Sequence, residues 1–398
     1  MLSGATPARR AAFLTAAYYG AMFAAFGAHL PYWPVWLESW GLDEADIGYF
    51  LGAATVARVA GTTLLPALAD ALAIRRWMIA GTCMATSVLI LLHLGAADRS
   101  SLLALTLLTA IAMAPSAPLG EALGQRAAGR FGFAYAPVRA VGSITFLAAT
   151  LGVGWGLERL GADLVVWTIA AFFLVTGVFG LLHPGGGAAA EVQDRAGRRD
   201  ALRLLATPVF ALFAVTAALG QASHAVYYAY SVLDWQADGI STTVIGALWA
   251  FGVVAETVLL LGPGRRIMVH IRPAHALGLA GLAGIIRWAL MAQSPGLEWL
   301  WPLQALHAGT FAIGHLGAMA FVAAAIPDRL NATAQGLKAG IVGGSLHALA
   351  LVGAAMVVGW IDIAAAYWLA AGMSGASLAG ALVLLFLWRG GHILRGSA

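Results

Sequence analysis

Residues 244–261, VIGALWAFGVVAETVLLL, form an apolar stretch long enough to cross much of a bilayer, yet they contain one carboxylate, that of Glu256. A charged side chain near the centre of a bilayer costs about 2.5–3.5 kcal/mol on scales derived from membrane insertion. We therefore expect Glu256 to face protein or water and to have a partner. This stretch decides the fold because the first half of the chain contains a copy of it.

The copy lies at residues 47–58, IGYFLGAATVAR, which match residues 245–256, IGALWAFGVVAE, at an offset of 198 residues. The identical positions are Ile47/Ile245, Gly48/Gly246, Val56/Val254 and Ala57/Ala255, and upstream Gly41 falls on Gly239. Where both copies break the apolar pattern, the first has Arg58 and the second has Glu256. The offset is about half of the 398 residues. It predicts two repeated halves in the same orientation, related by an axis along the membrane normal.

The composition indicates a membrane protein. Hydrophobic residues make up 61% of the chain and charged residues 10%, with a mean hydropathy of +0.84, whereas soluble proteins contain about 25% charged residues. Polar breaks divide the chain into twelve apolar segments of spanning length, six in each half. We expect helices near residues 11–36, 46–68, 76–95, 101–122, 140–159, 163–183, 207–230, 242–262, 275–293, 299–326, 339–360 and 364–388.

Basic residues predict the orientation. Of the 22 Lys and Arg residues, only Arg99 and Arg159 fall on the predicted outer side and only Arg58 and Arg287 within helices, which leaves 18 on the cytoplasmic side. This distribution follows the positive-inside rule and predicts that both termini are cytoplasmic. We expect an N-terminal six-helix half at 1–183, a flexible cytoplasmic loop at 184–206, rich in Gly and charge, and a C-terminal half at 207–398.

Several polar and aromatic side chains lie within the predicted spans, where ionisable residues often have a function. A histidine in a helix bundle can also simply bond a neighbouring carbonyl, the aromatic residues can be ordinary packing, and Glu256 can form a structural ion pair with Arg287. At 100° per residue, helix 7 places its three polar candidates on one face, and helix 10 does the same for its first two together with Phe311. The candidates are Tyr19 and Phe26 (helix 1), Arg58 (helix 2), Gln221, His224 and Tyr228 (helix 7), Glu256 (helix 8), Arg287 (helix 9), and Gln304, His307, Thr310 and His315 (helix 10).

A second candidate group is Glu121 with Arg139. The carboxylate is predicted to close helix 4, and the arginine to open helix 5 just after Pro137, a residue that suits a helix start. The alternative is an interfacial salt bridge worth less than about 1 kcal/mol. Sequence motifs for a nucleophile, a phosphate loop or a metal site are lacking, so we expect no enzymatic activity, no cofactor and no metal.

These residues resemble the phenylpropionic acid permease group of the major facilitator superfamily, which is related to the lactose–proton and nucleoside–proton symporters. The resemblance covers nearly the whole chain. It is strongest in LPYWPVWLESWGL, IGYFLGAATVAR, PLGEAL with PVRAVGS, QASHAVYYAYSVLDWQADG, IGALWAFGVVAE, IIRW and LQALHAGTFAIGHLGAM. It implies the major facilitator fold, an all-α membrane protein of twelve transmembrane helices in two pseudo-repeat halves, and a transport activity.

The resemblance also implies roles for individual residues. Glu121 and Arg139 are similar to the carboxylate–arginine pair that engages sugar in lactose permease, at the same spacing of 18. Glu256, Arg287 and His307 are similar to residues that line the coupling site of that protein. The chain departs from the pattern at Thr310, where lactose permease has its proton-carrying glutamate, and at Gln304, which replaces a lysine.

The loop after helix 2, PALADALAIRRW, resembles the superfamily's gating loop. It keeps Asp70, Arg75 and Arg76 but lacks the glycine before the aspartate. The proline-containing helix 5 pattern of drug antiporters is absent, which favours uptake over efflux.

We therefore expect a proton-coupled symporter for a small aromatic carboxylate in a bacterial inner membrane. Arg58 or Arg287 would bind the carboxylate through its guanidinium fork, and Tyr19, Phe26 and Tyr228 would hold the ring. Glu256, with His307 nearby, would carry the proton. The alternatives are a sugar or nucleoside symporter and a non-transporting membrane sensor. The expected partners are the substrate, protons and lipid, without nucleic acid, and we expect a monomer.

Overall fold

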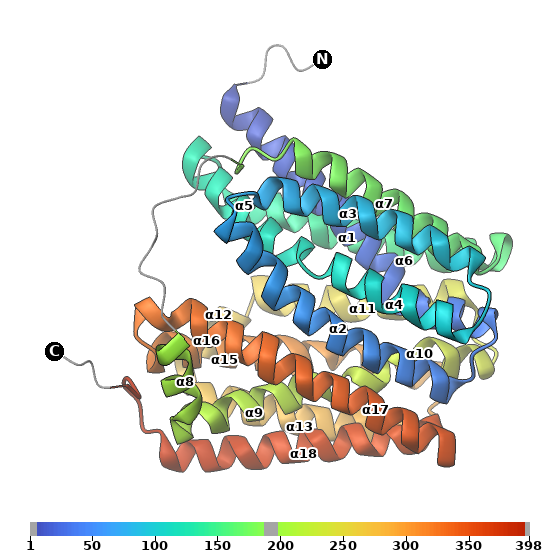
Figure 1. Cartoon of the computed structure of the whole chain (residues 1–398). Coiled ribbons are helices and arrows are strands. Elements are labelled where there is room, and N and C mark those ends of the chain that lie inside the picture. The colour runs from blue at the N-terminus through green and yellow to red at the C-terminus, as the bar shows by residue number, and fades with distance from the viewer. Residues whose placement is uncertain (1–5, 187–197, 395–398) are drawn as a thin grey trace. The chain divides into compact units, whose positions relative to one another are not determined.

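The computed structural model describes residues 6–186 and 198–394, and every regular element in these two stretches is a helix (Figure 1). Within them, 12 helical spans are long and apolar enough to cross a membrane. The predicted all-α fold of twelve spans is therefore confirmed.

The first six spans follow the predicted order, and the main difference lies at the fourth. Predicted to end at 122, this helix continues to Phe131, where Gly132 in a left-handed conformation ends it. Glu121 therefore lies inside α5 instead of closing a helix, and the next helix starts before Pro137. The elements are α1 (Pro7–Trp40), α2 (Glu44–Ala71), α3 (Arg75–Leu92), η1 (His93–Gly95), α4 (Arg99–Met113), α5 (Ser116–Phe131), α6 (Tyr135–Leu160) and α7 (Asp163–Leu181).

The last six spans are more irregular than predicted. The seventh, expected to be one helix, breaks at Ser223 and His224. The tenth and eleventh each contain a π-helical segment, η2 and η4, and such segments often occur at functional sites. The elements are α9 (Pro208–Ala222), α10 (Ala225–Ala237), α11 (Thr242–Leu261), α12 (Gly264–His270), α13 (Pro273–Met291), α14 (Leu297–Ala305), η2 (Ala308–Ile313), α15 (Gly314–Ala325), η3 (Asp328–Leu330), α16 (Asn331–Gly336), η4 (Leu337–Gly343), α17 (Gly344–Trp360) and α18 (Ile363–Leu387).

The predicted central loop at 184–206 is only partly described, because residues 187–197, with Arg195 among them, lie outside the described residues. Its last part is helical: α8 spans Arg198–Ala206. The prediction of a flexible loop is therefore wrong for these nine residues. The sequence argument weighed the Gly content of the loop and overlooked RRDALRLLA, in which leucines and charged residues alternate at helical spacing.

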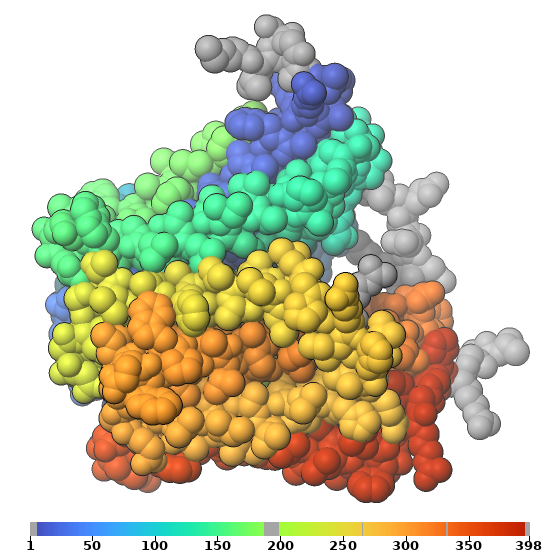
Figure 2. Space-filling model, turned by 180° about the vertical axis from the view of Figure 1, so that it is seen from behind, coloured from blue at the N-terminus to red at the C-terminus, as the bar shows by residue number. Residues whose placement is uncertain are grey.

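The helices form two compact units. Unit 1 comprises Met1–Leu42, Ala53–Glu191 and Trp235–Ala247, and unit 2 comprises Asp43–Gly52, Val192–Asp234 and Leu248–Ala398. In unit 1, α1 packs against α6 and α7, and α3 packs against α7. In unit 2, α18 packs against α13 and α9, and the space-filling view shows the side chains of α13, α14 and α15 covering one face (Figure 2). The division into halves at residues 184–206 stays a prediction.

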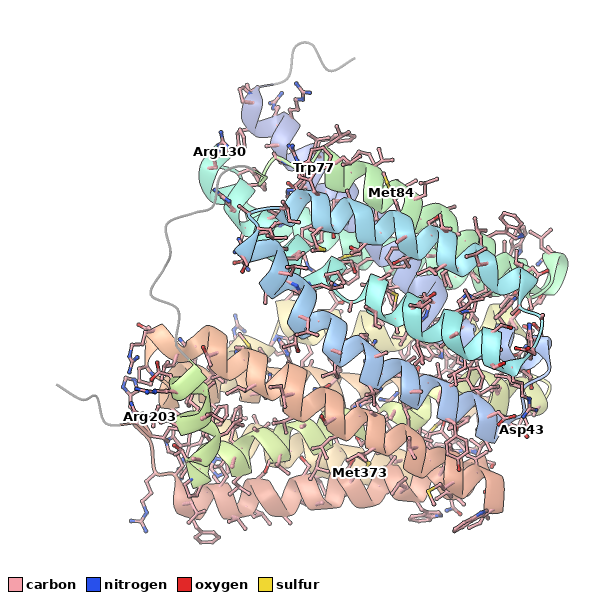
Figure 3. The ribbon with its side chains drawn as sticks, in the orientation of Figure 1. Asp43, Trp77, Met84, Arg130, Arg203 and Met373 are labelled. Carbon is pink, nitrogen blue, oxygen red and sulfur yellow. The ribbon has the colours of Figure 1, made fainter. Side chains whose placement is uncertain are left out.

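The two ends of unit 2 each have a labelled charged residue, and the two residues have opposite signs. Figure 3 shows Arg203, on α8, at one end and Asp43, just before α2, at the other. This is the pattern from which the orientation was predicted. Which end faces the cytoplasm stays a prediction.

The glycines of the repeat have a packing role. A Cβ atom at Gly48 would lie 2.0 Å from the Tyr230 hydroxyl oxygen in unit 2, and one at Gly246 would lie 2.7 Å from the Tyr32 hydroxyl oxygen in unit 1. The two tyrosines are themselves 198 residues apart, the offset of the repeat. Each copy therefore requires glycine because a tyrosine approaches its backbone.

Candidate functional site

Arg287, on α13, is the centre of a buried polar cluster in unit 2, with a side chain that is 0% exposed. Its Nη1 donates to His307 Nδ1 (3.0 Å) and to Thr310 Oγ1 (3.2 Å), and its Nη2 donates to Gln304 Oε1 (3.0 Å). All three acceptors are electrically neutral groups. Among the described residues no carboxylate forms an ion pair with this guanidinium, so the direct Glu256–Arg287 pair considered from the sequence is not formed.

The cluster also contains donors that are not used. Arg287 Nε and Gln304 Nε2 are buried and have no hydrogen-bond partner in the described part of the chain. A buried donor without an acceptor costs about 1–3 kcal/mol. Two such donors on side chains that already bond each other indicate a place for an additional acceptor.

The geometry of the tenth span explains why three of the residues in that span contact Arg287. The α-helix α14 ends at Ala305, and the π-helical segment η2 begins at Ala308, immediately after His307. His307 and Thr310 both contact Nη1 of Arg287, while Gln304, one turn earlier, contacts Nη2. Of the face predicted for helix 10, Gln304 and His307 contact Arg287, and Thr310 joins them in place of Phe311.

The hydrogen bonds assign a tautomer to each buried histidine. His224 Nδ1 lies 3.2 Å from the carbonyl oxygens of Gly220 and Gln221, which only accept, so Nδ1 carries the proton and Nε2 accepts from the Thr310 hydroxyl at 3.0 Å. His307 Nδ1 accepts from Arg287, so its Nε2 carries the proton.

Glu256, on α11, is the acidic member of the cluster. The protonated Nε2 of His307 lies 3.4 Å from Glu256 Oε2, and the Glu256 side chain is 18% exposed. The carboxylate is therefore linked to Arg287 through a neutral imidazole. The predicted coupling residues Glu256, His307 and Arg287 form one chain of contacts.

Aromatic rings surround the series of contacts from Glu256 through His307 to Arg287. The Arg287 guanidinium lies over Tyr227 (4.9 Å) and Trp288 (4.5 Å), and Tyr227 stacks on Trp249 at 4.5 Å. The predicted residue Tyr228 stacks on His224 at 5.9 Å. Phe311 stacks between His307 (5.3 Å) and the exposed His315 (6.4 Å). The predicted residue Gln221 contributes its backbone carbonyl to His224.

Unit 1 contains the second predicted cluster. Arg139 Nε, on α6, donates to Glu121 Oε1 on α5 at 2.6 Å, and the Tyr135 hydroxyl donates to Glu121 Oε2. The Arg139 guanidinium lies 4.1 Å from the ring centre of Phe23. The structure thus brings Glu121 and Arg139 together, and both carboxylate oxygens already accept hydrogen bonds.

The two aromatic candidates of α1 lie in the same unit. Tyr19 is 0% exposed, with its hydroxyl 3.1 Å from the Gly120 carbonyl oxygen and 2.8 Å from the Tyr135 hydroxyl. Phe26 packs edge-on against Phe173, with ring centres 6.0 Å apart. Tyr19 therefore supports the Glu121 cluster and has no exposed ring face in this structure.

Arg58, on α2, has an exposed side chain and forms no ion pair with any described residue. In the predicted gating loop, Arg75 Nε donates to Asp70 Oδ1, and Arg76 lies over the Trp77 ring at 5.4 Å. The acid and one arginine of this loop are therefore in contact, and its gating role stays a prediction.

Four contact residues were not identified from the sequence: Tyr227, Trp288, Tyr135 and Phe23. The helix break at Ser223 and His224 changes the phase of helix 7, so Tyr227 faces Arg287 although continuous helical spacing favours Tyr228. The Trp288 indole N–H donates to Ser223 Oγ in that same break, at 3.0 Å. Tyr135 lies one turn before Arg139 on α6, a spacing from which it could have been identified, whereas Phe23 reaches the pair from α1, which spacing alone does not reveal.

Comparison with known proteins assigns the family. The family described as "MFS_1 like family" matches residues 13–368. The chain belongs to this family of the major facilitator superfamily. It is 30% identical to the "Probable 3-phenylpropionic acid transporter" of Escherichia coli over 315 residues, 77% of this chain and 80% of that protein. It is also 25% identical to the "Maltose permease" of Geobacillus stearothermophilus over 376 residues, 93% of each chain.

Solved structures of transporters share the fold of this major facilitator protein. The nucleoside transporter NupG superposes with a TM-score of 0.81 at 17% identity, over 95% of this chain and 100% of that one. A POT family peptide transporter gives a TM-score of 0.72 at 14% identity, over 96% and 97%. The family match and the 30% identical relative, together with this fold, show that the protein is a multi-pass membrane transporter and not an enzyme.

Proposed function

We propose that this major facilitator protein is a proton-coupled symporter that takes up a small aromatic carboxylate. The observation that supports this most is the Arg287 cluster, a buried cation whose partners are neutral and which retains two unused donors. A substrate carboxylate would supply the missing negative charge and accept from these donors. The 30% identity to a probable 3-phenylpropionic acid transporter points to the same substrate class.

Coupling would arise from a change in the partners of Arg287. Without substrate, Arg287 donates to His307 Nδ1 and thereby polarises the His307 Nε2–H group that lies 3.4 Å from Glu256 Oε2, which would favour the carboxylate form of Glu256. A substrate carboxylate bound to Arg287 would weaken that polarisation and favour protonation of Glu256. One proton would then accompany one anion.

The aromatic residues around the cluster would hold the ring of the substrate. Tyr228 and Phe311 are partly buried, and His315 is exposed beside Phe311. Gln221, Gln304, Thr310 and His224 would position the polar end. Phe26 of unit 1 remains a predicted ring contact, whereas the fully buried ring of Tyr19 does not support that role, and Arg58 is the other candidate for the carboxylate.

Substrate competition tests the proposal. Purified protein in proteoliposomes should take up labelled 3-phenylpropionate, and unlabelled 3-phenylpropionate should compete, whereas its neutral isostere 3-phenylpropan-1-ol should not. Equal competition by the alcohol, or the absence of uptake, would overturn it. Loss of anion binding in Arg287→Lys with normal binding in Arg58→Lys assigns the carboxylate to Arg287, and the reverse result assigns it to Arg58.

A sugar or nucleoside symporter is the second candidate, and the 25% identity to a maltose permease over 93% of the chain favours it. In that case Glu121 and Arg139 would engage sugar hydroxyls. Both Glu121 oxygens already accept from Arg139 and Tyr135, so sugar binding would require those bonds to be replaced. Competition by maltose or uridine against labelled 3-phenylpropionate distinguishes the candidates.

A non-transporting sensor would show no substrate-dependent proton flux in the same vesicles. We also propose a monomer in a bacterial inner membrane. Light scattering of the detergent-solubilised protein would test the monomer, and membrane fractionation of the producing cells would test its location.

A further inference from the structure

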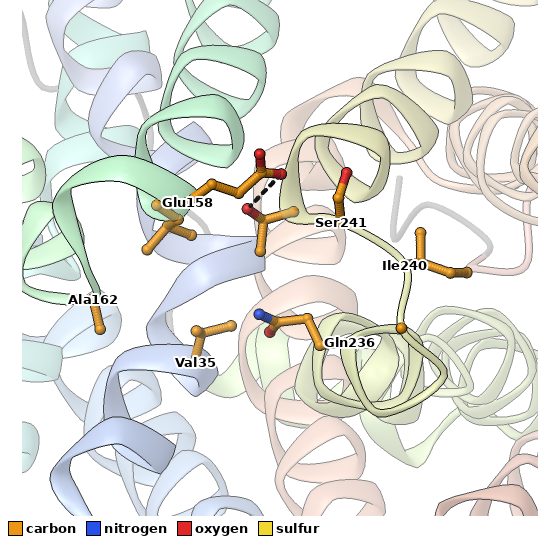
Figure 4. A pocket seen from close by; sticks show the side chains of 9 residues that line it. Val35, Glu158, Ala162, Gln236, Ile240 and Ser241 are labelled. Atoms are coloured by element: carbon orange, nitrogen blue, oxygen red, sulfur yellow. Dashed lines mark hydrogen bonds between the residues drawn. The ribbon is translucent and has the colours of Figure 1, made fainter.

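A hollow of about 400 Å³ lies in unit 1, at the end where α1 finishes and α11 begins. This volume is in the range of small-molecule sites. Val35, Leu157 and Ile240 contribute apolar side chains to its lining, and Glu158, Gln236 and Ser241 contribute polar ones, with Gln236 across from Glu158 (Figure 4). It is therefore a separate site from both clusters described above.

Glu158, at the end of α6, has acceptor capacity that the protein does not use. Its Oε1 accepts from the Thr243 backbone N–H at 2.9 Å and from the Thr242 hydroxyl at 3.4 Å (Figure 4). Its Oε2 lies 3.9 Å from Arg159 Nη1, beyond hydrogen-bond distance. Arg159 instead donates to the Trp155 carbonyl oxygen at 2.8 Å and stacks on the Trp155 ring at 4.2 Å. Arg159 is thus a distant counter-ion of Glu158, because its own donor group is used by the Trp155 carbonyl.

Gln236, at the end of α10, supplies a second acceptor. Its Oε1 is buried and accepts no hydrogen bond from any described residue. Figure 4 shows its side chain extending between Val35 and the loop before α11. An occupant that donates to Gln236 Oε1 would remove the cost of this unsatisfied oxygen.

We infer that this hollow binds a small primary alkylammonium ion. An –NH₃⁺ group would place a second, closer positive charge beside Glu158, and it has three N–H donors, enough for Glu158 Oε2 and Gln236 Oε1 together. The alkyl chain packs on Val35, Leu157 and Ile240. A quaternary ammonium has no N–H donor, and a neutral alcohol has no charge, so each satisfies only part of the site.

The site is tested by calorimetric titration of the purified full chain with n-butylammonium chloride. Tetramethylammonium chloride and 1-butanol are the ligand controls, at matched ionic strength. We expect saturable binding of n-butylammonium and at least tenfold weaker binding of either control. Equal binding of tetramethylammonium, or no saturable binding of n-butylammonium, would overturn the inference.

Three variants locate the binding. Glu158→Gln keeps an oxygen for the Thr243 N–H but removes the charge, and it should weaken n-butylammonium binding about tenfold, the loss expected for a charged hydrogen bond. Gln236→Met keeps the side-chain length without the acceptor and should weaken binding by about threefold to tenfold. Glu298→Gln, at an exposed acid of α14 in unit 2, is the matched control and should bind normally. Unchanged binding in both Glu158→Gln and Gln236→Met would contradict the site, even if saturable binding exists elsewhere.

Discussion

The polar cluster of unit 1 and that of unit 2 contain similar residues, but their hydrogen bonds are distributed differently. In unit 1 the Glu121 carboxylate accepts from Arg139 and from Tyr135, so one positive and one negative charge neutralise each other directly. In unit 2, Arg287 donates only to neutral groups, and Glu256 reaches it through His307. In the first arrangement the two charges are already paired with each other. The second leaves a cation that can accept an anion and a carboxylate whose protonation can respond.

Thr310→Glu should have the largest effect, because it would give Arg287 a carboxylate partner, as Glu121 is for Arg139 in unit 1. The new carboxylate would lie beside Arg287, whose Nη1 is 3.2 Å from Thr310 Oγ1, and would compete with an anionic substrate. We expect affinity for 3-phenylpropionate to fall on the order of a hundredfold. Calorimetric titration measures it, with Thr310→Gln as the neutral control of equal size. Affinity within threefold of the parent would contradict the claim that Arg287 binds the substrate carboxylate.

His183 gives a pH test outside the membrane spans. Its Nδ1 accepts from the Gly185 N–H at 3.1 Å, and burial lowers its pKa to about 4. The unfolded chain binds this proton below about pH 6.5, whereas the folded protein does so only near pH 4, so stability falls as pH decreases through this window. At pH 5 the loss should be about 2 kcal/mol relative to neutral pH.

Thermal unfolding at graded pH measures this effect. His183→Asn, whose side-chain oxygen can still accept from Gly185, should lose that part of the pH dependence while transport is unchanged. A parallel pH dependence in parent and variant would exclude His183 as its source. The result would sharpen the comparison, because it would assign a stability role to a titrating group of unit 1.

Tyr135→Phe should have the smallest effect. It removes one of the two donors to Glu121, and we expect a loss of about 1 kcal/mol in stability. Uptake of 3-phenylpropionate should stay within about twofold of the parent, since the Glu121–Arg139 cluster of unit 1 does not bind the substrate carboxylate in our proposal. A large loss of uptake without loss of stability would show that unit 1 takes part in substrate binding directly.

The sequence predicted the twelve spans because bilayer thickness dictates the length of an apolar helix. It did not predict the end of α5 at Gly132, the break at Ser223 and His224, or the two π-helical segments. The break in the seventh span includes a contact between distant segments, the bond from Trp288 to Ser223, whereas the end of α5 has a local signal, Gly132 in a left-handed conformation, that the sequence argument overlooked.

The site was predictable in part. Helical spacing put Gln304 and His307 on one face, and both contact Arg287, but it put Phe311 with them and did not indicate the contact of Thr310 with Arg287. The position of His307 between Glu256 and Arg287 was not predictable. Helical spacing shows which residues share a face, but it does not show whether Glu256 contacts Arg287 directly or through a third side chain.

Substrate-driven proton movement in proteoliposomes measures the central proposal most directly. With an entrapped pH dye, 3-phenylpropionate should acidify the lumen for the parent protein. Glu256→Gln should abolish this signal while it retains counterflow exchange of labelled substrate, and Glu121→Gln should acidify the lumen as the parent does. Proton movement that persists in Glu256→Gln, or that is lost in Glu121→Gln with exchange intact, would contradict the assignment of coupling to unit 2.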